Sequence, residues 1–169
     1  VVTRPAACII TPVDLDHQQF LGDTLAKIAF EKAGILKRGV TAIIGPQPED
    51  ALEVIERQAA KVSAPLLVHG QHWHVSVEAE RLIYQDETGL LDLPLPNLTG
   101  PHQIQNAGAT IATLRYLGMD EIACTAAISQ ANWPARMQRL RTGPLLKNLS
   151  RNEVWLDGGH NPAAGRAIA

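Results

Sequence analysis

Apolar residues in the first seventy positions occur in short runs that alternate with longer amphipathic stretches. Three apolar runs lie at 6–11, 40–44 and 65–68 and are bounded by Pro or Gly, which is typical of buried strands. The stretches at 24–33 and 48–62 instead repeat apolar residues at helical spacing. Strands that alternate with helices of this length predict an α/β layer with a parallel sheet.

The pattern changes near His72. Residues 73–93 alternate between apolar and polar side chains and contain a turn signal at Glu87-Thr88-Gly89. This alternation predicts short antiparallel strands, because successive side chains of a strand point to opposite faces. We therefore expect a small antiparallel sheet, over residues 72–98, attached to the parallel layer.

Two helices and two separate strands are expected in the second half. The helices are predicted at about 103–117 and 120–131, and the strands at 137–140 and 154–156. Asn161-Pro162 predicts one more helix start, with Asn as N-cap and Pro at the first helical position. This last unit holds one strand and the start of a helix, which is too little for a domain. Since the chain also lacks an initiator Met, we expect it to be a piece of a longer protein.

Composition narrows the class of protein. Hydrophobic residues make up 46% and charged residues 19% of the 169 positions, as in ordinary globular proteins. The net charge is −2 and no basic run occurs, so neither nucleic-acid nor anionic-membrane binding is expected. Cys8 and Cys124 lie in apolar contexts, which favours buried thiols in a reducing compartment. No apolar run approaches the length of a membrane span.

Lys32 occupies an unusual position in the first predicted helix. At about 100° per residue, Lys32 falls between Leu25 and Ile28 in the apolar arc, away from the polar face that includes Lys27 and Glu31. Such an amine must extend to solvent, lose its proton or meet a strong partner. One interpretation is a lysine that extends to solvent from the helix end. The other is a functional amine, which can act as a nucleophile or take up carbon dioxide as a carbamate that binds Mg²⁺.

A polar turn precedes that helix. Asp14, Asp16 and His17 follow the first predicted strand, and ligands of open α/β sheets bind at the carboxyl ends of the strands. The turn is equally compatible with a solvated acidic loop that carries a surface histidine, because Asp is a common turn residue.

Four motifs in one order resemble a known family. They are Leu15-Asp16-His17 with Leu21-Gly22-Asp23-Thr24 and Glu31-Lys32-Ala33-Gly34, then Gly100-Pro101-His102-Gln103-Ile104-Gln105-Asn106-Ala107, then Trp133-Pro134-Ala135-Arg136-Met137-Gln138, and finally Leu156-Asp157-Gly158-Gly159-His160-Asn161-Pro162. Together they resemble folylpolyglutamate synthase and the bifunctional dihydrofolate synthase. These enzymes belong to the Mur ligase superfamily of ATP-dependent amide ligases.

The resemblance implies roles for two residues in the first motif. His17 matches a histidine that ligates Mg²⁺. Lys32 matches a lysine that is carbamylated in many members of the superfamily, which makes it a catalytic residue and a metal ligand. His17 and Lys32 would then face one Mg²⁺ from two sides.

The other motifs imply nucleotide contacts. Asn106 matches a residue at the adenine, Arg136 an arginine at the ATP phosphates, and Asp157 the residue that holds the ribose. His160 matches a histidine at the inter-domain cleft that is implicated in nucleotide or glutamate binding, and we include it among the catalytic candidates. Without the resemblance, these residues are compatible with a helix cap, a surface ion pair and a turn.

The resemblance also implies the fold and its division. Residues 1–141 would form the back part of a central ATPase domain with a partial P-loop-NTPase-like sheet. Residues 142–149 would be a linker, and 150–169 the first strand of a Rossmann-like C-terminal ligase domain. The glycine-rich phosphate loop and a Mg²⁺-binding glutamate would lie upstream of Val1, so we expect the segment alone to be inactive. Ala135 replaces a glycine of the motif, which matters only if the position needs a positive φ or a close approach of the backbone.

The implied activity is an ATP-dependent ligase of the cytoplasm. It would be a monomer that activates a carboxylate as an acyl phosphate and joins L-glutamate to dihydropteroate or to the γ-carboxylate of a folate, with ATP and Mg²⁺ as cofactors. Three alternatives stay open at this point: another Mur-type ligase that acts on a cell-wall precursor, a non-catalytic nucleotide-binding module, and a dinucleotide-dependent oxidoreductase. The last lacks a Gly-x-Gly-x-x-Gly motif after a strand.

Overall fold

A parallel sheet lies at the centre of the N-terminal half. The computed structural model describes residues 2–147, 152–161 and 164–166. The sheet contains β1 (Cys8–Ile10), β2 (Ala42–Ile44) and β3 (Leu66–Val68), in the order β1-β2-β3. Cys8 pairs with Ala42, and Ala42 in turn pairs with Leu66. The predicted α/β layer with a parallel sheet is confirmed.

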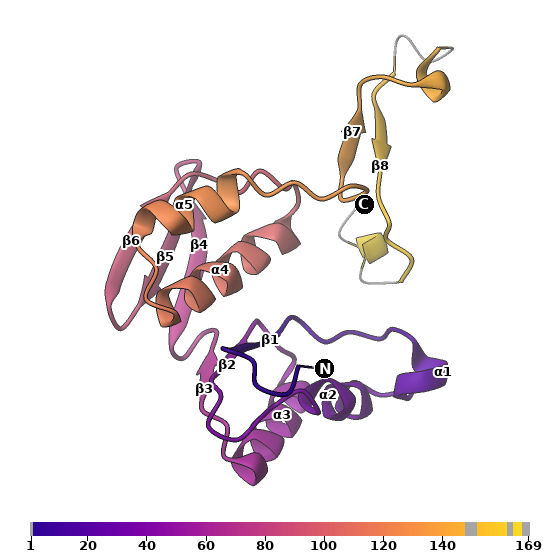
Figure 1. Ribbon diagram of the computed structural model, residues 1–169. Helices are drawn as coiled ribbons and strands as arrows, with labels where there is room; N and C mark the ends of the chain where they lie inside the picture. The colour runs from indigo at the N-terminus through magenta and orange to yellow at the C-terminus, as the bar shows by residue number, and fades with distance from the viewer. Residues whose placement is uncertain (1, 148–151, 162–163, 167–169) are drawn as a thin grey trace.

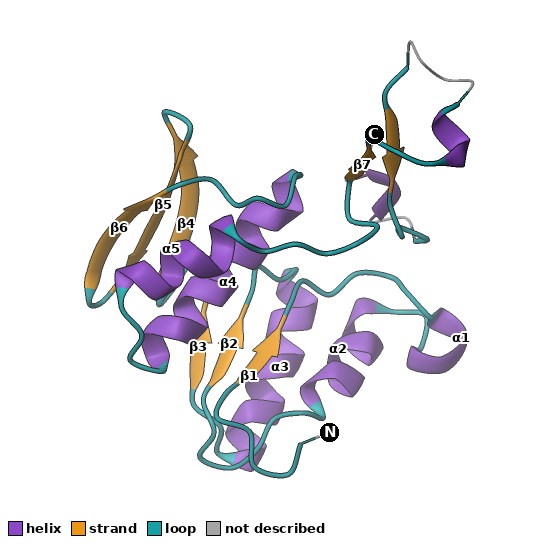
Figure 2. Cartoon of the chain, turned by 45° about the horizontal axis from the view of Figure 1, so that its top comes forward, coloured by secondary structure: helices purple, strands orange, loops and turns teal. Residues whose placement is uncertain are grey.

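The central strand is buried on both faces. Ala42 and Ile44 belong to one hydrophobic core, whereas Ile43 belongs to the second core on the opposite face. This division follows from the alternation of side chains along a strand. Helices α2 (Leu25–Ala33) and α3 (Glu49–Val62) contribute buried side chains to the first core, and they pack against each other. Figure 2 shows the two helices beside β1–β3, with α4 across the sheet from them.

Local sequence sets where these helices begin. The Thr24 side chain accepts a hydrogen bond from Lys27 N at 3.3 Å, which caps α2. Helix α3 carries Glu49 and Asp50 in its first turn, where the helix dipole favours acids. The short helix α1 (Gln18–Leu21) precedes α2 and ends at Gly22. Both predicted long helices are confirmed within one residue of their expected bounds.

The second core joins an antiparallel sheet to a long helix. Strands β4 (Trp73–Glu78), β5 (Arg81–Asp86) and β6 (Gly89–Leu93) form the sheet in that order, as the alternation predicted. Helix α4 (Pro101–Tyr116) covers it so closely that a Cβ on Gly108 would lie 2.7 Å from Trp73 Cζ3 and Val75 Cγ1. Helix α5 (Glu121–Ser129) packs on α4. Helix α4 begins two residues earlier, and α5 ends two residues earlier, than expected.

The C-terminal elements form a hairpin that stands apart from both sheets (Figure 1). Strand β7 (Gln138–Leu140) pairs antiparallel with β8 (Val154–Leu156), and the 3₁₀ helix η1 (Pro144–Leu146) follows β7. The pairing therefore joins strands on either side of the expected linker. The division into domains stays a prediction. Pro162, which was predicted at the first position of a helix, lies outside the described residues.

Both cysteines are buried and free, as expected. Within the described ranges, no helix combines the length and the apolar character needed to cross a membrane.

Asp86 accepts several hydrogen bonds at the edge of the second core. Its carboxylate accepts hydrogen bonds from Arg115 Nε at 2.7 Å and Nη2 at 3.0 Å, and from the Tyr84 hydroxyl at 3.2 Å. Thr88 adds bonds from its backbone N–H and its hydroxyl. Burial alone would raise the pKa of Asp86, but the bonds from Thr88 and Arg115 outweigh it and lower the pKa below 3.8.

Asp86→Ala is expected to lower the free energy of unfolding by about 2–4 kcal/mol, because it leaves a largely buried guanidinium without its partner. The matched control is Asp92→Ala, which removes an exposed pair with Arg81 and should cost about 0–1 kcal/mol. Because the folded-state pKa of Asp86 is lowered, its contribution is complete above the unfolded pKa and is lost as pH falls through the folded value. Urea unfolding between neutral and acidic pH measures both effects. Equal losses for the two variants would contradict the assigned role.

Candidate functional site

The loop after β1 places Asp16 and His17 at the carboxyl end of the parallel sheet. Asp16 Oδ1 accepts the backbone N–H of His17 at 2.8 Å. His17 adopts a left-handed backbone, with φ 48° and ψ 37°, at the start of α1. This conformation is unfavourable for a residue with a Cβ, and it occurs here at a position where sheet proteins bind ligands.

A second loop, after β8, meets the first. Asn161 Nδ2 donates to Asp16 Oδ2 at 3.0 Å, across 145 positions of the chain. Arg166 forms an ion pair with Asp14 beside it. Asn161 Oδ1 also accepts the N–H of Ala164 at 2.8 Å, which confirms Asn161 as an N-cap.

The two loops bring His17 and His160 together, and we call Asp16, His17, His160 and Asn161 the two-loop corner. The imidazole centroids are 5.8 Å apart and the rings are inclined by 50°. One ligand atom from each of Asp16, His17 and His160 lies within 4.8 Å of the others. An open hollow of about 400 Å³ is lined by these residues with Leu15, Gln18 and Gln19. The hydrogen bond from Asn161 is the main reason why the pKa of Asp16 is lowered, so its carboxylate is ionised at neutral pH.

Asp157 ties the same loop to the segment before β7. Its carboxylate accepts the N–H of Met137 at 2.7 Å and of Gly159 at 2.6 Å. Gly158 N–H donates to the carbonyl of Ala135 at 2.8 Å. The bond from Met137 is the largest cause of the lowered pKa of Asp157, and the nearby charges of Arg136 and His102 contribute. Arg136 itself is exposed, with no ion-pair partner among the described residues.

Ala135 has a positive φ of 56°, so the motif's glycine is replaced at a position that favours glycine. We expect Ala135→Gly to raise the free energy of unfolding by about 1 kcal/mol, because it relieves a left-handed alanine. Ala126→Gly, within α5, is the matched control and should lower it by about 1 kcal/mol. Chemical denaturation of both variants measures the difference. If both lose stability alike, Ala135 is not strained.

The first turns of α4 present a chain of polar side chains. Asn106 Nδ2 donates to Gln103 Oε1 at 3.1 Å, and Gln103 Nε2 lies 3.1 Å from His102 Nε2. His102 Nδ1 and Gln105 Oε1 are buried, and neither has a hydrogen-bond partner among the residues that the structure describes. Unpaired buried polar atoms are costly and rare in native proteins, so these two need an explanation such as a bound water or ion.

The structure therefore brings the predicted residues into two groups. His17 lies with His160, and Arg136 lies near Asp157, while Asn106 lies on α4 with Gln103 and belongs to neither group. Lys32 joins neither group of described residues. It lies in the last turn of α2 and is exposed.

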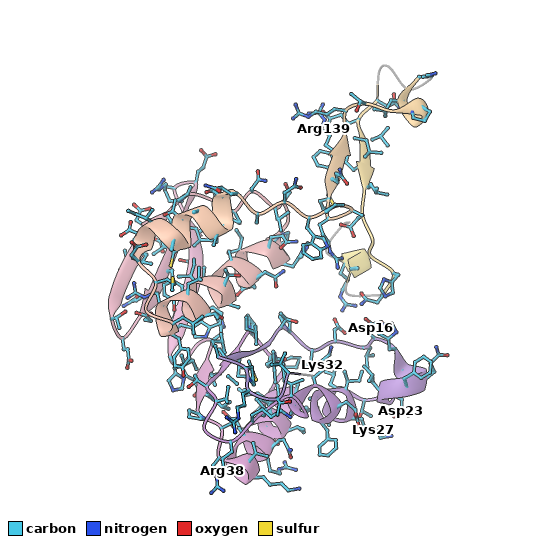
Figure 3. The ribbon with its side chains drawn as sticks, viewed as in Figure 1. Asp16, Asp23, Lys27, Lys32, Arg38 and Arg139 are labelled. Carbon is cyan, nitrogen blue, oxygen red and sulfur yellow. The ribbon has the colours of Figure 1, made fainter. Side chains whose placement is uncertain are left out.

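The exposed position of Lys32 agrees with the first of its two interpretations, a lysine that extends to solvent from the helix end. Ile28, Ala29 and Ala33 are fully buried, but Lys32 lies in the last turn of the helix, where a long side chain reaches solvent. Figure 3 shows Lys32 on the side of α2 nearer Asp16, with Lys27 on the other side. The role of Lys32 as a ligand stays a prediction.

The predicted metal ligands did not include Asp16, although the sequence placed it in a turn at a ligand-binding position and in a quoted motif. The missing signal was its partner, since only the folded chain brings Asn161 to its carboxylate. Sequence reasoning also missed His102 and Gln105, whose burial depends on packing.

Known proteins match this arrangement over almost the whole chain. The chain is 31% identical to a folylpolyglutamate synthase of Lacticaseibacillus casei over 95% of its length, and 30% identical to a dihydrofolate synthase/folylpolyglutamate synthase of Bacillus subtilis over 99%. The chain resembles one segment of these synthases. It spans 38% and 40% of the length of the two relatives. No family model matches the chain.

Solved structures of these synthases share the fold. An FPGS–AMPPCP–folate complex superposes with a TM-score of 0.80 at 26% identity, over 97% of this chain and 41% of that one. Escherichia coli FolC in complex with DHPP and ADP gives a TM-score of 0.79 at 33% identity, over 94% of this chain and 36% of that one. The arrangement of the parallel sheet, antiparallel sheet and helices is thus that of the folylpolyglutamate synthases.

Proposed function

We propose that the protein is an ATP-dependent amide ligase that adds L-glutamate to dihydropteroate or to the γ-carboxylate of folates. The observation that carries the proposal is the double contact of the loop after β8. This loop touches the loop after β1 through Asn161 and Asp16, and the segment before β7 through Asp157 and Met137. These contacts bring His17 near His160 and Arg136 near Asp157, whereas Lys32 joins neither group. The relatives named above, whose complexes hold AMPPCP with folate or ADP with DHPP, support this assignment.

Three residues would hold the nucleotide in this proposal. Asn106 keeps its amide oxygen available for the adenine amino group, since its Nδ2 is bonded to Gln103. Asp157 uses one lone pair of each carboxylate oxygen on backbone N–H groups, which leaves the others to accept from ribose hydroxyls. Arg136 supplies a planar fork of donors for phosphate oxygens.

The reaction needs positioning more than covalent chemistry from the protein. The acceptor carboxylate attacks the γ-phosphoryl group, which gives an acyl phosphate and ADP. The amine of glutamate then attacks the acyl carbon, inorganic phosphate leaves, and the amide forms. Arg136 would stabilise the charge on the transferred group, and His160 would bind a nucleotide or glutamate oxygen at the corner.

Mg²⁺ fits the described residues only in part. Mg²⁺ prefers oxygen ligands in octahedral geometry, and it commonly polarises phosphate oxygens in such reactions. At the two-loop corner Asp16 offers one carboxylate, whereas His17 and His160 offer nitrogen. The implied site of His17 with a carbamylated Lys32 stays a proposal, and no step above depends on it.

Two further parts of the proposal concern the whole protein. We propose that residues 1–141 belong to its ATPase domain and that 150–169 begin its C-terminal domain. We also propose that the protein acts in the cytoplasm as a monomer.

The variant Lys32→Ala distinguishes two hypotheses, that the protein is a ligase and that it is a non-catalytic nucleotide-binding module. The observation that favours the second hypothesis is the exposed position of Lys32. In the full-length protein we expect Lys32→Ala to lower kcat for amide formation about a hundredfold, as removal of a group that acts at the reacting centre does. Lys27→Ala, on the same helix and paired with Asp23, is the control and should keep normal turnover. Unchanged turnover in both variants would remove Lys32 from the catalytic residues.

A further inference from the structure

A cavity lies where the parallel sheet meets the antiparallel sheet, and we call it the sheet-junction cavity. Its volume is about 720 Å³, a size that holds small organic molecules. Its walls come from the amino ends of β2, β3 and β4, from the end of β5 with the turn after it, and from the last turn of α4. Figure 1 shows β3 leading into β4, with α4 beside them. None of the residues assigned above to nucleotide, substrate or metal lines this cavity.

The Asp86 carboxylate in the cavity wall has no lone pair left for a ligand. It accepts five hydrogen bonds, two from Arg115, two from Thr88 and one from Tyr84. An ionised carboxylate offers about four lone-pair positions, so a further donor finds no acceptor there. A ligand whose polar groups are all donors is therefore poorly matched to this wall.

Two N–H donors in the same wall are left without an acceptor. Arg115 gives Nε and Nη2 to Asp86, whereas its Nη1 has no acceptor among the residues that the structure describes. His72 Nδ1 accepts the backbone N–H of Val68 at 3.1 Å, so the ring hydrogen must lie on Nε2, which likewise has no described acceptor. Both side chains line the cavity. A ligand that fits this cavity therefore brings an acceptor atom.

The charges around the cavity favour a neutral ligand. Asp86 neutralises Arg115, because the two side chains form a bidentate pair that is largely shielded from solvent. Glu87, exposed on the turn after β5, adds a negative charge that repels an anion. A cation gains little, since Asp86 accepts no further bond and a pair with an exposed carboxylate contributes little free energy.

Apolar side chains supply another part of the wall. Pro65, Leu67 and Ala112 line the cavity, and a flat ring placed against them removes apolar surface from water. We propose that the sheet-junction cavity binds a neutral aromatic amide or lactam, whose carbonyl oxygen accepts a hydrogen bond from Arg115 Nη1 and whose ring packs against Leu67 and Ala112. His72 Nε2–H is available to a second acceptor atom of such a ligand.

This site goes beyond the proposed function. Thr41 and Pro65 precede β2 and β3, so the cavity lies at the amino ends of these strands. The loop that carries Asp16 and His17 instead follows the carboxyl end of β1. Failure of ligand binding at the cavity would leave the ligase proposal intact, and absence of ligase activity would leave the cavity site intact.

Three probes that share one ring system test the class of ligand. At neutral pH 2-naphthamide is neutral, 2-naphthoate is an anion and 2-naphthylmethylamine is a cation. Each is titrated into full-length protein labelled with ¹⁵N-tryptophan, because Trp73 lines the cavity, and Trp73→Phe identifies its indole N–H resonance. We expect 2-naphthamide to shift this resonance in a saturable way. Its Kd should be at least about tenfold lower than that of either charged probe, as a hydrogen bond from a charged donor contributes.

Two variants test the roles of Arg115 and Glu87. Arg115→Lys keeps a charge beside Asp86 but loses the second terminal nitrogen, so 2-naphthamide should bind about tenfold more weakly. Glu87→Gln removes the negative charge on the exposed turn, so 2-naphthoate should bind about threefold more tightly while the Kd of 2-naphthamide is unchanged. Glu56→Gln is the control, because Glu56 is exposed on α3 and does not line the cavity, and it should change neither affinity.

Circular dichroism checks that the variants are folded. The proposal is overturned if 2-naphthamide gives no saturable shift of the Trp73 resonance, or if the three probes bind with equal affinity. Unchanged 2-naphthamide binding in folded Arg115→Lys would overturn it as well. If Arg115→Lys does not fold, the three probes and the exposed variants decide, since equal 2-naphthoate binding in Glu87→Gln and Glu56→Gln would contradict selection by charge.

Discussion

Replacing Arg136 by Ala in the full-length protein is expected to lower kcat/KM for amide formation about a thousandfold, the lower range for an arginine that stabilises phosphoryl transfer. The guanidinium is exposed beside Asp157, and none of the described residues forms an ion pair with it. Its fork of donors is therefore available to phosphate oxygens, whose charge grows most in the transition state. Steady-state kinetics with saturating glutamate measures the loss.

Arg139→Ala is the matched control for Arg136. Arg139 is also exposed and lies three positions further on, but it is paired with Glu153 on the hairpin, away from Asp16 (Figure 3). We expect Arg139→Ala to change kcat/KM by less than about threefold, as surface pairs contribute little. Arg136→Lys should recover only part of the rate, because an ammonium keeps the charge and loses the fork. Similar kinetics for Arg136→Ala and Arg139→Ala would contradict a phosphate contact.

Trp73→Ala is expected to cost about 3–5 kcal/mol of unfolding free energy, the range for removal of a large aromatic side chain from a core. Trp73 is 1% exposed, stacks on Tyr84 with centroids 6.2 Å apart, and donates from Nε1 to the carbonyl of Leu67 at 3.1 Å. It also fills the space against Gly108 of α4. The substitution leaves a cavity where the two sheets and the helix meet, together with an unpaired carbonyl.

Trp133→Ala is the control for Trp73, because Trp133 is 66% exposed. It should change stability by less than about 1 kcal/mol, as surface substitutions generally do. Equilibrium unfolding in urea, followed by circular dichroism because both variants lose a fluorophore, gives the two values. A loss below about 1 kcal/mol for Trp73→Ala would show that the second core does not depend on this side chain.

The fold could be predicted from the sequence where its signal is local. Alternation over 73–93 determined the antiparallel sheet, and Thr24 marked the start of α2, because both depend on neighbouring residues alone. The pairing of β7 with β8 could not be predicted. Each strand has only three residues, and even the paired residues Leu140 and Val154 lie 14 positions apart, so no local pattern links the two strands.

The candidate site was predictable in its residue types and less so in its contacts. Motifs selected His17 and His160, but their approach to 5.8 Å is a long-range contact that no spacing encodes. Helical phase placed Lys32 among apolar residues and left open whether its amine reaches solvent or acts in a site, and the folded chain shows that the side chain is exposed. The positive φ of Ala135 likewise arises from the bonds that tie it to Gln138 and Gly158.

Product formation by the full-length protein tests the central claim most directly. The protein is incubated with ATP, glutamate and either dihydropteroate, folate or a cell-wall precursor, and phosphate release and product mass are measured together. We predict that phosphate is released in amounts equal to the glutamate added, only when ATP, glutamate and a pterin substrate are all present. Phosphate release without a glutamylated product, or glutamylation of the cell-wall precursor in place of the pterin substrates, would contradict the account.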